Sequence, residues 1–245
     1  MSRCRMAATI AAWLGVAACA VAHPSMGDGA GGDDTYLGVP VSGIRAAADA
    51  VAGSAKPARA AAAPAPAAAV AQLSYRPDTG VHERVVARLT GFFTQGDAAR
   101  RPLIAHRLDQ ADPLGQFDAL LRQQGYDSRN LADVFTAYLV LSWEVVNAAD
   151  AMQAADGVQA VRDAVRQAFA ANARMRALPD ADKQTVAETL GYLAMVAVAA
   201  QRELAQAGNP VALAELREGV RKTARNLAGV DLGGVLLDDS GFTPR

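Results

Sequence analysis

The chain has 245 residues, with 24 basic and 25 acidic side chains and a formal net charge of −1. Both cysteines lie in the first 22 residues and only three histidines follow, which excludes a thiol nucleophile or a multi-histidine metal centre from the rest of the chain. We predict no cofactor and no metal site, and the balanced charge argues against nucleic acid as a partner.

The first 22 residues have the pattern of a secretory signal peptide. Arg3 and Arg5 precede an uncharged run over residues 6–21, and the small residues Ala20 and Ala22 mark a cleavage site after Ala22. The alternatives are a lipobox at residues 16–19, in which Cys19 is lipidated, and an uncleaved leader. Because a bilayer span needs about 20 apolar residues, we expect none in the mature chain. The predicted location is the periplasm or the exterior, with an outer-membrane lipoprotein as the alternative.

Residues 23–72 are rich in Ala, Pro and Gly and predict a disordered linker, since such a composition buries too little apolar surface to fold. Residues 36–41 are the one apolar stretch within it. We interpret this stretch as an isolated patch in the linker. The alternative is a short segment that docks on a partner or on the domain itself.

Residues 73–245 predict an all-α fold, a compact bundle of six to seven helices, because apolar residues recur at spacings of three and four. Asp112–Pro113 and Asn209–Pro210 have the cap and proline of helix starts. Expected helix ends are at Gly96, Gly125, Gly157, Gly208 and Gly229. The helix from residue 130 to about 155 is apolar around most of its circumference and is expected in the middle of the bundle. Its narrow polar strip comprises Asp133, Thr136, Glu144 and Asn147.

Polar side chains on this central helix are the first candidate binding site. Tyr138, Trp143 and Asn147 need hydrogen-bond partners if buried. We favour bonds to neighbouring helices that fix their register, and the alternative is that these residues line a ligand pocket.

A row of arginines is the second candidate. Arg217, Arg221 and Arg225 follow one another at intervals of four on the last helix. The ordinary interpretation is a solvated helix edge. The alternative is a contact for an anionic envelope component or an acidic partner surface.

Other reactive groups give weak signals. His82 beside Glu83 could serve acid–base chemistry, but no Ser, Cys or third partner has a spacing from them that indicates a catalytic group. His106 is expected to be partly buried among apolar neighbours. Asp238 and Asp239 fall short of a calcium loop, whereas Gly241 is expected to turn the chain and Phe242 to dock on the bundle. No phosphate-binding loop or nucleophile elbow occurs.

The run of residues 138–147 resembles a family of secreted proteobacterial helical proteins of uncharacterised function. Asp112–Pro113–Leu114, Val230–Asp231–Leu232 and Gly241–Phe242 extend the resemblance over residues 73–245. It implies an exported helical domain. The family has no catalytic residues to carry over.

These observations predict an exported, non-enzymatic binding or interaction module of the bacterial envelope, with an unknown envelope protein or small ligand as partner. The first alternative is a carrier that holds a small apolar or amphipathic ligand inside the bundle. The second is an enzyme that uses carboxylates, such as Glu144 with Asp150 or Glu83.

Overall fold

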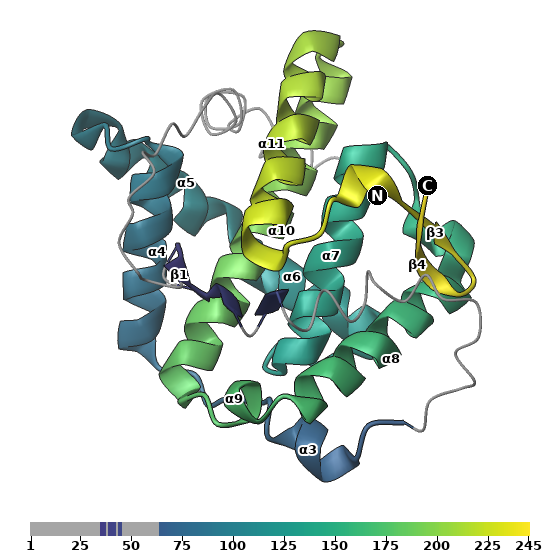
Figure 1. The fold of residues 1–245 in the computed structure, drawn as a ribbon. Helices are drawn as coiled ribbons and strands as arrows, with labels where there is room; N and C mark the ends of the chain where they lie inside the picture. Colours follow the sequence, from purple (N-terminus) through teal and green to yellow (C-terminus); the bar gives the residue numbers. More distant parts are fainter. Residues whose placement is uncertain (1–34, 38, 43, 46–63) are drawn as a thin grey trace, which may run out of the picture.

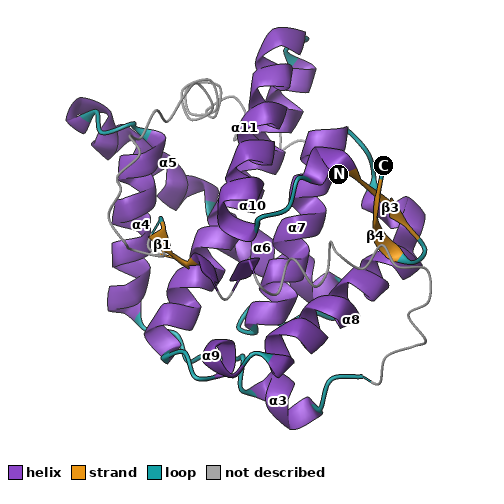
Figure 2. Ribbon diagram, viewed as in Figure 1, coloured by secondary structure: helices purple, strands orange, loops and turns teal. Residues whose placement is uncertain are grey.

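The structure is a computed structural model that describes residues 35–37, 39–42, 44–45 and 64–245. The predicted leader over residues 1–22, including Cys19, lies outside the described residues, as does most of the predicted linker. Helices dominate the described part of the chain (Figures 1 and 2), and the all-α prediction is confirmed.

Within residues 64–245, seven helices of 11 or more residues build the bundle. They are α4 (Thr79–Phe93), α5 (Arg101–Ala111), α6 (Pro113–Gln123), α7 (Leu131–Asn147), α8 (Ala155–Ala171), α10 (Asp180–Gln206) and α11 (Pro210–Ala228). The shorter helices are α3 (Ala67–Ala71), α9 (Ala173–Arg176) and the 3-10 turns η2 (Ala98–Arg100), η3 (Ala151–Ala154) and η4 (Leu232–Gly234). Two small hairpins pair β1 (Thr35–Tyr36) with β2 (Val39–Pro40) and β3 (Val235–Asp238) with β4 (Gly241–Pro244).

Side-chain caps begin the helices where the sequence predicts them. Asp112 accepts a hydrogen bond from the Gly115 amide at the start of α6, and Asn209 accepts one from the Ala212 amide at the start of α11. In both helices proline is the first residue, where its missing N–H costs nothing. Local sequence signals therefore set these two boundaries.

The predicted break at Gly157 is wrong. The central helix ends earlier, at Asn147, because Ala148 adopts the left-handed conformation with φ of 50°. Gly157 lies inside α8 instead. A Cβ there would lie 1.9 Å from the Asp238 carbonyl oxygen, so the glycine is needed for the close approach of the C-terminal hairpin.

Helix α7 is the centre of the bundle, packed against α6, α8, α10 and α11. Its predicted polar strip is only partly solvated. Asp133 and Thr136 are buried, whereas Glu144 and Asn147 are half-buried. The Thr136 hydroxyl donates to the Ala132 carbonyl 2.8 Å away, which satisfies it within the helix.

A small residue on α10 admits a second helix. A Cβ on Gly191 would lie 3.0 Å from side-chain atoms of both Leu114 and Phe117. Helix α6 therefore lies close against α10 at this position.

The C-terminal hairpin closes one side of the bundle beside α8 (Figure 1). Phe242 is buried, with its ring centroid 6.4 Å from that of Trp143, which confirms the predicted docking of the tail. The Asp238 carboxylate accepts bonds from Ser240 and Thr243, so it stabilises the hairpin turn.

Candidate functional site

An apolar pocket opens between α4, α7, α10 and α11, and its volume is about 60 Å³. Side chains from α10 and α11 form most of the walls, including Leu193, Val196, Leu216 and Val220. The partly exposed members of the lining are Phe92, Leu193, Gly219, Val220 and Thr223, and the others are buried. None of the lining residues is charged.

Two hydroxyl-bearing residues of α7 line this pocket, and both are buried. Tyr138 is 2% exposed and Ser142 is 1% exposed. The Tyr138 hydroxyl has no hydrogen-bond partner of normal geometry among the described residues. Burial raises the pKa of Tyr138 well above its ordinary value, Tyr36 adds to the increase, and the Ser142 hydroxyl opposes it. The lining of the pocket is therefore mostly apolar, with two buried hydroxyl-bearing residues.

A segment that precedes the helical domain docks beside this pocket. We call residues 36–45, apart from 38 and 43, the N-terminal strap. Val39 and Ile44 are both 0% exposed and belong to the main core, with Val41 also buried. The sequence interpretation of an isolated linker patch gives way to its alternative, docking on the domain itself. The strap contacts helices that are far from it in the sequence, and composition alone therefore does not reveal that it docks.

The strap and the pocket lie along the same two helices. Arg88 on α4 donates to the Leu37 carbonyl at 3.1 Å, and Arg45 donates to the Asn226 carbonyl on α11 at 2.5 Å. Arg88 is one turn before Phe92, and Asn226 is one turn after Thr223. The strap thus contacts α4 and α11 about one turn away from the pocket residues on each of these helices, and its strand β2 packs against α10.

Trp143 and Asn147 hold the C-terminal segment. The Trp143 indole donates to the Val235 carbonyl at 3.2 Å. The Asn147 amide donates to the Leu232 carbonyl at 3.1 Å and accepts from Arg245 at 2.6 Å. Their polar atoms are therefore engaged within the chain, and neither residue lines the pocket that contains Tyr138.

The arginine row is clamped by one carboxylate. Asp231 accepts two bonds from Arg221, at 2.5 and 2.7 Å, and one from Arg225 at 2.6 Å. Arg221, followed by Arg225, holds the pKa of Asp231 well below its ordinary value. Arg217 does not join them, and its buried Nε has no partner among the described residues. Two of the three arginines, Arg221 and Arg225, thus fasten the chain that follows α11.

His82 pairs with a residue that the sequence did not indicate. Its Nδ1 lies 2.9 Å from Glu188 Oε2 on α10, with side chains 41% and 10% exposed. Gln184 donates to Glu188 at 2.7 Å and bonds the backbone of Asp78 in both directions. This network joins the start of α4 to α10. The sequence signal for this network is the polar pair Gln184 and Glu188, which lie four residues apart on an otherwise apolar helix face.

The predicted burial of His106 is wrong, and the candidate carboxylates Glu144 and Asp150 lie outside the pocket. His106 is exposed, not partly buried, because Ile104 and Leu108 take the buried face of α5. Glu144 accepts a hydrogen bond from the Ala151 amide, and Asp150 caps η3. Burial raises the pKa of Glu144. No carboxylate lines the α4–α11 pocket.

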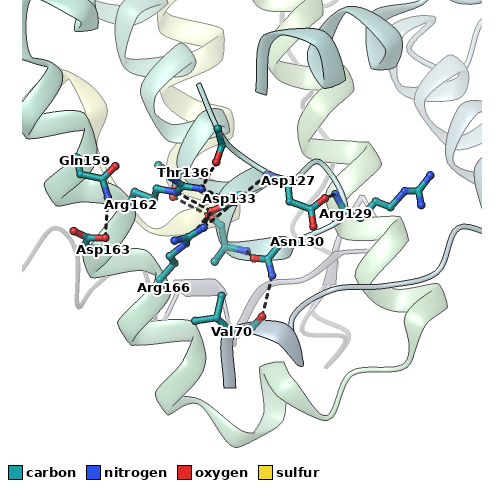
Figure 3. Close-up of polar contacts among 12 residues, drawn as sticks. Val70, Asp127, Arg129, Asn130, Asp133, Thr136, Gln159, Arg162, Asp163 and Arg166 are labelled. Atoms are coloured by element: carbon teal, nitrogen blue, oxygen red, sulfur yellow. Dashed lines mark hydrogen bonds and ion pairs between the residues drawn. The ribbon is translucent and has the colours of Figure 1, made fainter. Parts of the chain in front are cut away.

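A buried ion cluster joins α7 to α8 (Figure 3). Asp133, 1% exposed, accepts two bonds each from Arg162 and Arg166 at 2.9–3.0 Å and one from the Asp127 amide. The Arg162 guanidinium also lies 3.9 Å from the centre of the Tyr126 ring. Burial alone would raise the pKa of Asp133, but the arginine hydrogen bonds outweigh it and the pKa is lowered. Every oxygen of this carboxylate is engaged, so the cluster is structural.

The residues that the structure describes contain neither a metal-binding cluster nor a single membrane-spanning helix. No group of three or more His, Cys, Asp or Glu side chains is arranged to hold a metal ion there. No single helix of that part has the length and apolarity of a membrane span, although the α7–α8 pair, bent by 119°, passes by length and composition alone.

Comparison with known proteins gives a family without an assigned activity. No curated protein and no solved structure matches this chain. A sequence profile described as "Family of unknown function (DUF6683)" matches residues 43–242, which include α4 to α11 and the end of the strap. The chain belongs to this family of unknown function.

Proposed function

We propose that this chain is an exported, non-enzymatic interaction module that takes an apolar anchor group of a partner polypeptide in the α4–α11 pocket. The observation that carries the proposal is the pocket itself, which has apolar walls, no charged lining residue and an opening between helices. Such pockets with few polar groups are the usual form of binding sites.

The strap supports a polypeptide as the partner. Its Val39, Val41 and Ile44 side chains are buried, and the Arg88 guanidinium on α4 donates a hydrogen bond to the backbone carbonyl of Leu37. The helices that form the pocket thus already hold one apolar segment of the chain, and no strap residue lines the pocket itself. A partner segment would continue the same mode of packing.

The size of the pocket favours an anchor group over a whole enclosed ligand. Its volume of about 60 Å³ is well below the roughly 150 Å³ of an engineered apolar cavity that binds benzene. A few heavy atoms fill it. This favours the interaction module over the carrier that is the first alternative.

Binding of isobutene, a small apolar probe, tests this proposal. We expect methyl NMR shifts at Leu193, Val196, Leu216 and Val220, which line the pocket. Ala197→Leu fills the pocket and should abolish these shifts. Ala199→Leu, on the same helix but outside the lining, should retain them. Absence of shifts in the native chain, or equal shifts in both variants, contradicts the proposal.

Export is the second part of the proposal and has its own test. The leader pattern and the cleavage site after Ala22 support it. Mass spectrometry of the mature chain should give an N-terminus at His23, or a lipidated Cys19 in the lipoprotein alternative. A full-length chain retained in the cytoplasm contradicts export.

A further inference from the structure

The lining of the α4–α11 pocket is apolar apart from three hydroxyl-bearing residues. Tyr138 and Ser142 are one turn apart on α7 and both line the pocket. Of the other lining residues only Thr223, which is partly exposed, carries a side-chain hydrogen-bonding group. The two α7 residues are therefore the buried members of the lining that can form a side-chain hydrogen bond with an anchor.

The Tyr138 hydroxyl is buried and makes no hydrogen bond of normal geometry with a described group. Ser142 lies near enough to oppose the rise in the pKa of Tyr138, but it does not complete such a bond. A buried polar group without a partner costs about 1–3 kcal/mol. Phenylalanine would fill the same space without that cost, so packing alone does not account for a tyrosine here. A bound group that accepts or donates a hydrogen bond at this point does.

The charge of the lining restricts this group further. No charged side chain lines the pocket. A carboxylate or ammonium buried without a counter-charge is strongly disfavoured, whereas a neutral oxygen needs only a hydrogen bond. The anchor is therefore neutral.

We infer that the anchor is a partner side chain with a short apolar stem and a neutral oxygen at its tip, and that this oxygen bonds Tyr138, supported by Ser142. The inference rests on the proposed function, since it names the chemistry of the group that the same pocket takes. Threonine, asparagine and glutamine side chains have this form. A purely aliphatic anchor would leave the Tyr138 hydroxyl without a hydrogen bond of normal geometry.

Acetone and isobutene test the inference because they share one shape and differ in a single atom position, where oxygen replaces a methylene group. Their affinities are measured by NMR titration on the native chain and on Tyr138→Phe. Taking the ratio of the two affinities in each protein removes the difference in hydration between the probes. We expect the acetone-to-isobutene ratio to fall roughly 3- to 10-fold in Tyr138→Phe.

Ser142→Ala should lower the same ratio, and Thr223→Val, at the opposite wall, should leave it unchanged. An unchanged ratio in both Tyr138→Phe and Ser142→Ala overturns the inference, while continued isobutene binding leaves the proposed function standing. Failure of the native chain to bind either probe overturns both. Thermal unfolding of each variant verifies that the fold is retained, and Ser142→Ala provides the test if Tyr138→Phe does not fold.

Discussion

Gly157 on α8 and the carbonyl of Asp238 in the C-terminal hairpin are in contact so close that no other residue fits at position 157. A Cβ would lie 1.9 Å from that oxygen, and the obstacle is backbone rather than a flexible side chain. The hairpin in turn carries Phe242 against Trp143. One glycine thus sets how the C-terminal segment meets the bundle.

Gly157→Ala should destabilise the fold by about 1–3 kcal/mol, because the hairpin must move to relieve the overlap. Urea unfolding measures the difference. Gly91→Ala is the matched control: it lies in α4 with open space around it, and should gain about 0.5–1 kcal/mol from helix propensity. Equal changes in unfolding free energy at the two positions would show that the contact with the hairpin does not require glycine at position 157.

Asp133→Asn should destabilise the fold by about 3–5 kcal/mol near neutral pH, because it leaves Arg162 and Arg166 without their buried counter-charge. The pKa of Asp133 is lowered from 3.8 in the folded chain. Its charge therefore stabilises the fold above about pH 4, and this contribution is lost as the pH falls through the folded-state pKa.

Unfolding free energies of the native chain and Asp133→Asn should accordingly converge below pH 3.8. Asp163→Asn, an exposed carboxylate on α8 that bonds only Gln159 among the side chains described, is the control and should change stability little. If the difference in unfolding free energy between the native and Asp133→Asn proteins stays constant as the pH falls from neutral to below 3.8, Asp133 is not a charged carboxylate in the folded chain.

Ile44→Ala tests whether the strap is part of the folded core. Ile44 is 0% exposed, so truncation should cost about 2–5 kcal/mol in urea unfolding. Ser42→Ala, on an exposed residue of the same strap, should change stability by no more than about 0.5 kcal/mol. If both substitutions are neutral, the segment behaves as a linker.

Tyr138→Phe should leave the unfolding free energy unchanged or raise it by about 1 kcal/mol, because the hydroxyl that it removes has no partner. Tyr75→Phe is the matched comparison. The Tyr75 hydroxyl donates to the Ser128 carbonyl at 3.4 Å, so its loss should cost about 0.5–1 kcal/mol. A larger cost at Tyr138 than at Tyr75 would mean that the Tyr138 hydroxyl is already satisfied.

Much of the fold follows from local sequence signals, and the exceptions have physical causes. Asp112–Pro113 and Asn209–Pro210 fix helix starts within a few residues, so they can be read directly from the sequence. Ala148 ends α7 in a left-handed conformation that favours glycine, and no local pattern indicates this. Gly157 has the residue type of a helix end but serves tertiary packing.

The candidate site was less predictable because its groups meet across long sequence separations. Helical periodicity placed Tyr138 on the buried face of α7, but the pocket also needs side chains from α4, α10 and α11. Glu188 is 106 residues from His82, and Asp231 follows the arginine row only after α11 has ended. Spacing along one helix cannot indicate such partners, whereas it does indicate which residues are buried.

A structure of the protein with acetone bound tests the central claim most directly. We expect the acetone oxygen in the α4–α11 pocket at about 2.6–3.0 Å from the Tyr138 hydroxyl, with its methyl groups against Leu193 and Leu216. Acetone that binds elsewhere, or that turns its oxygen toward the mouth of the pocket, would contradict the claim that Tyr138 is the group that recognises the anchor.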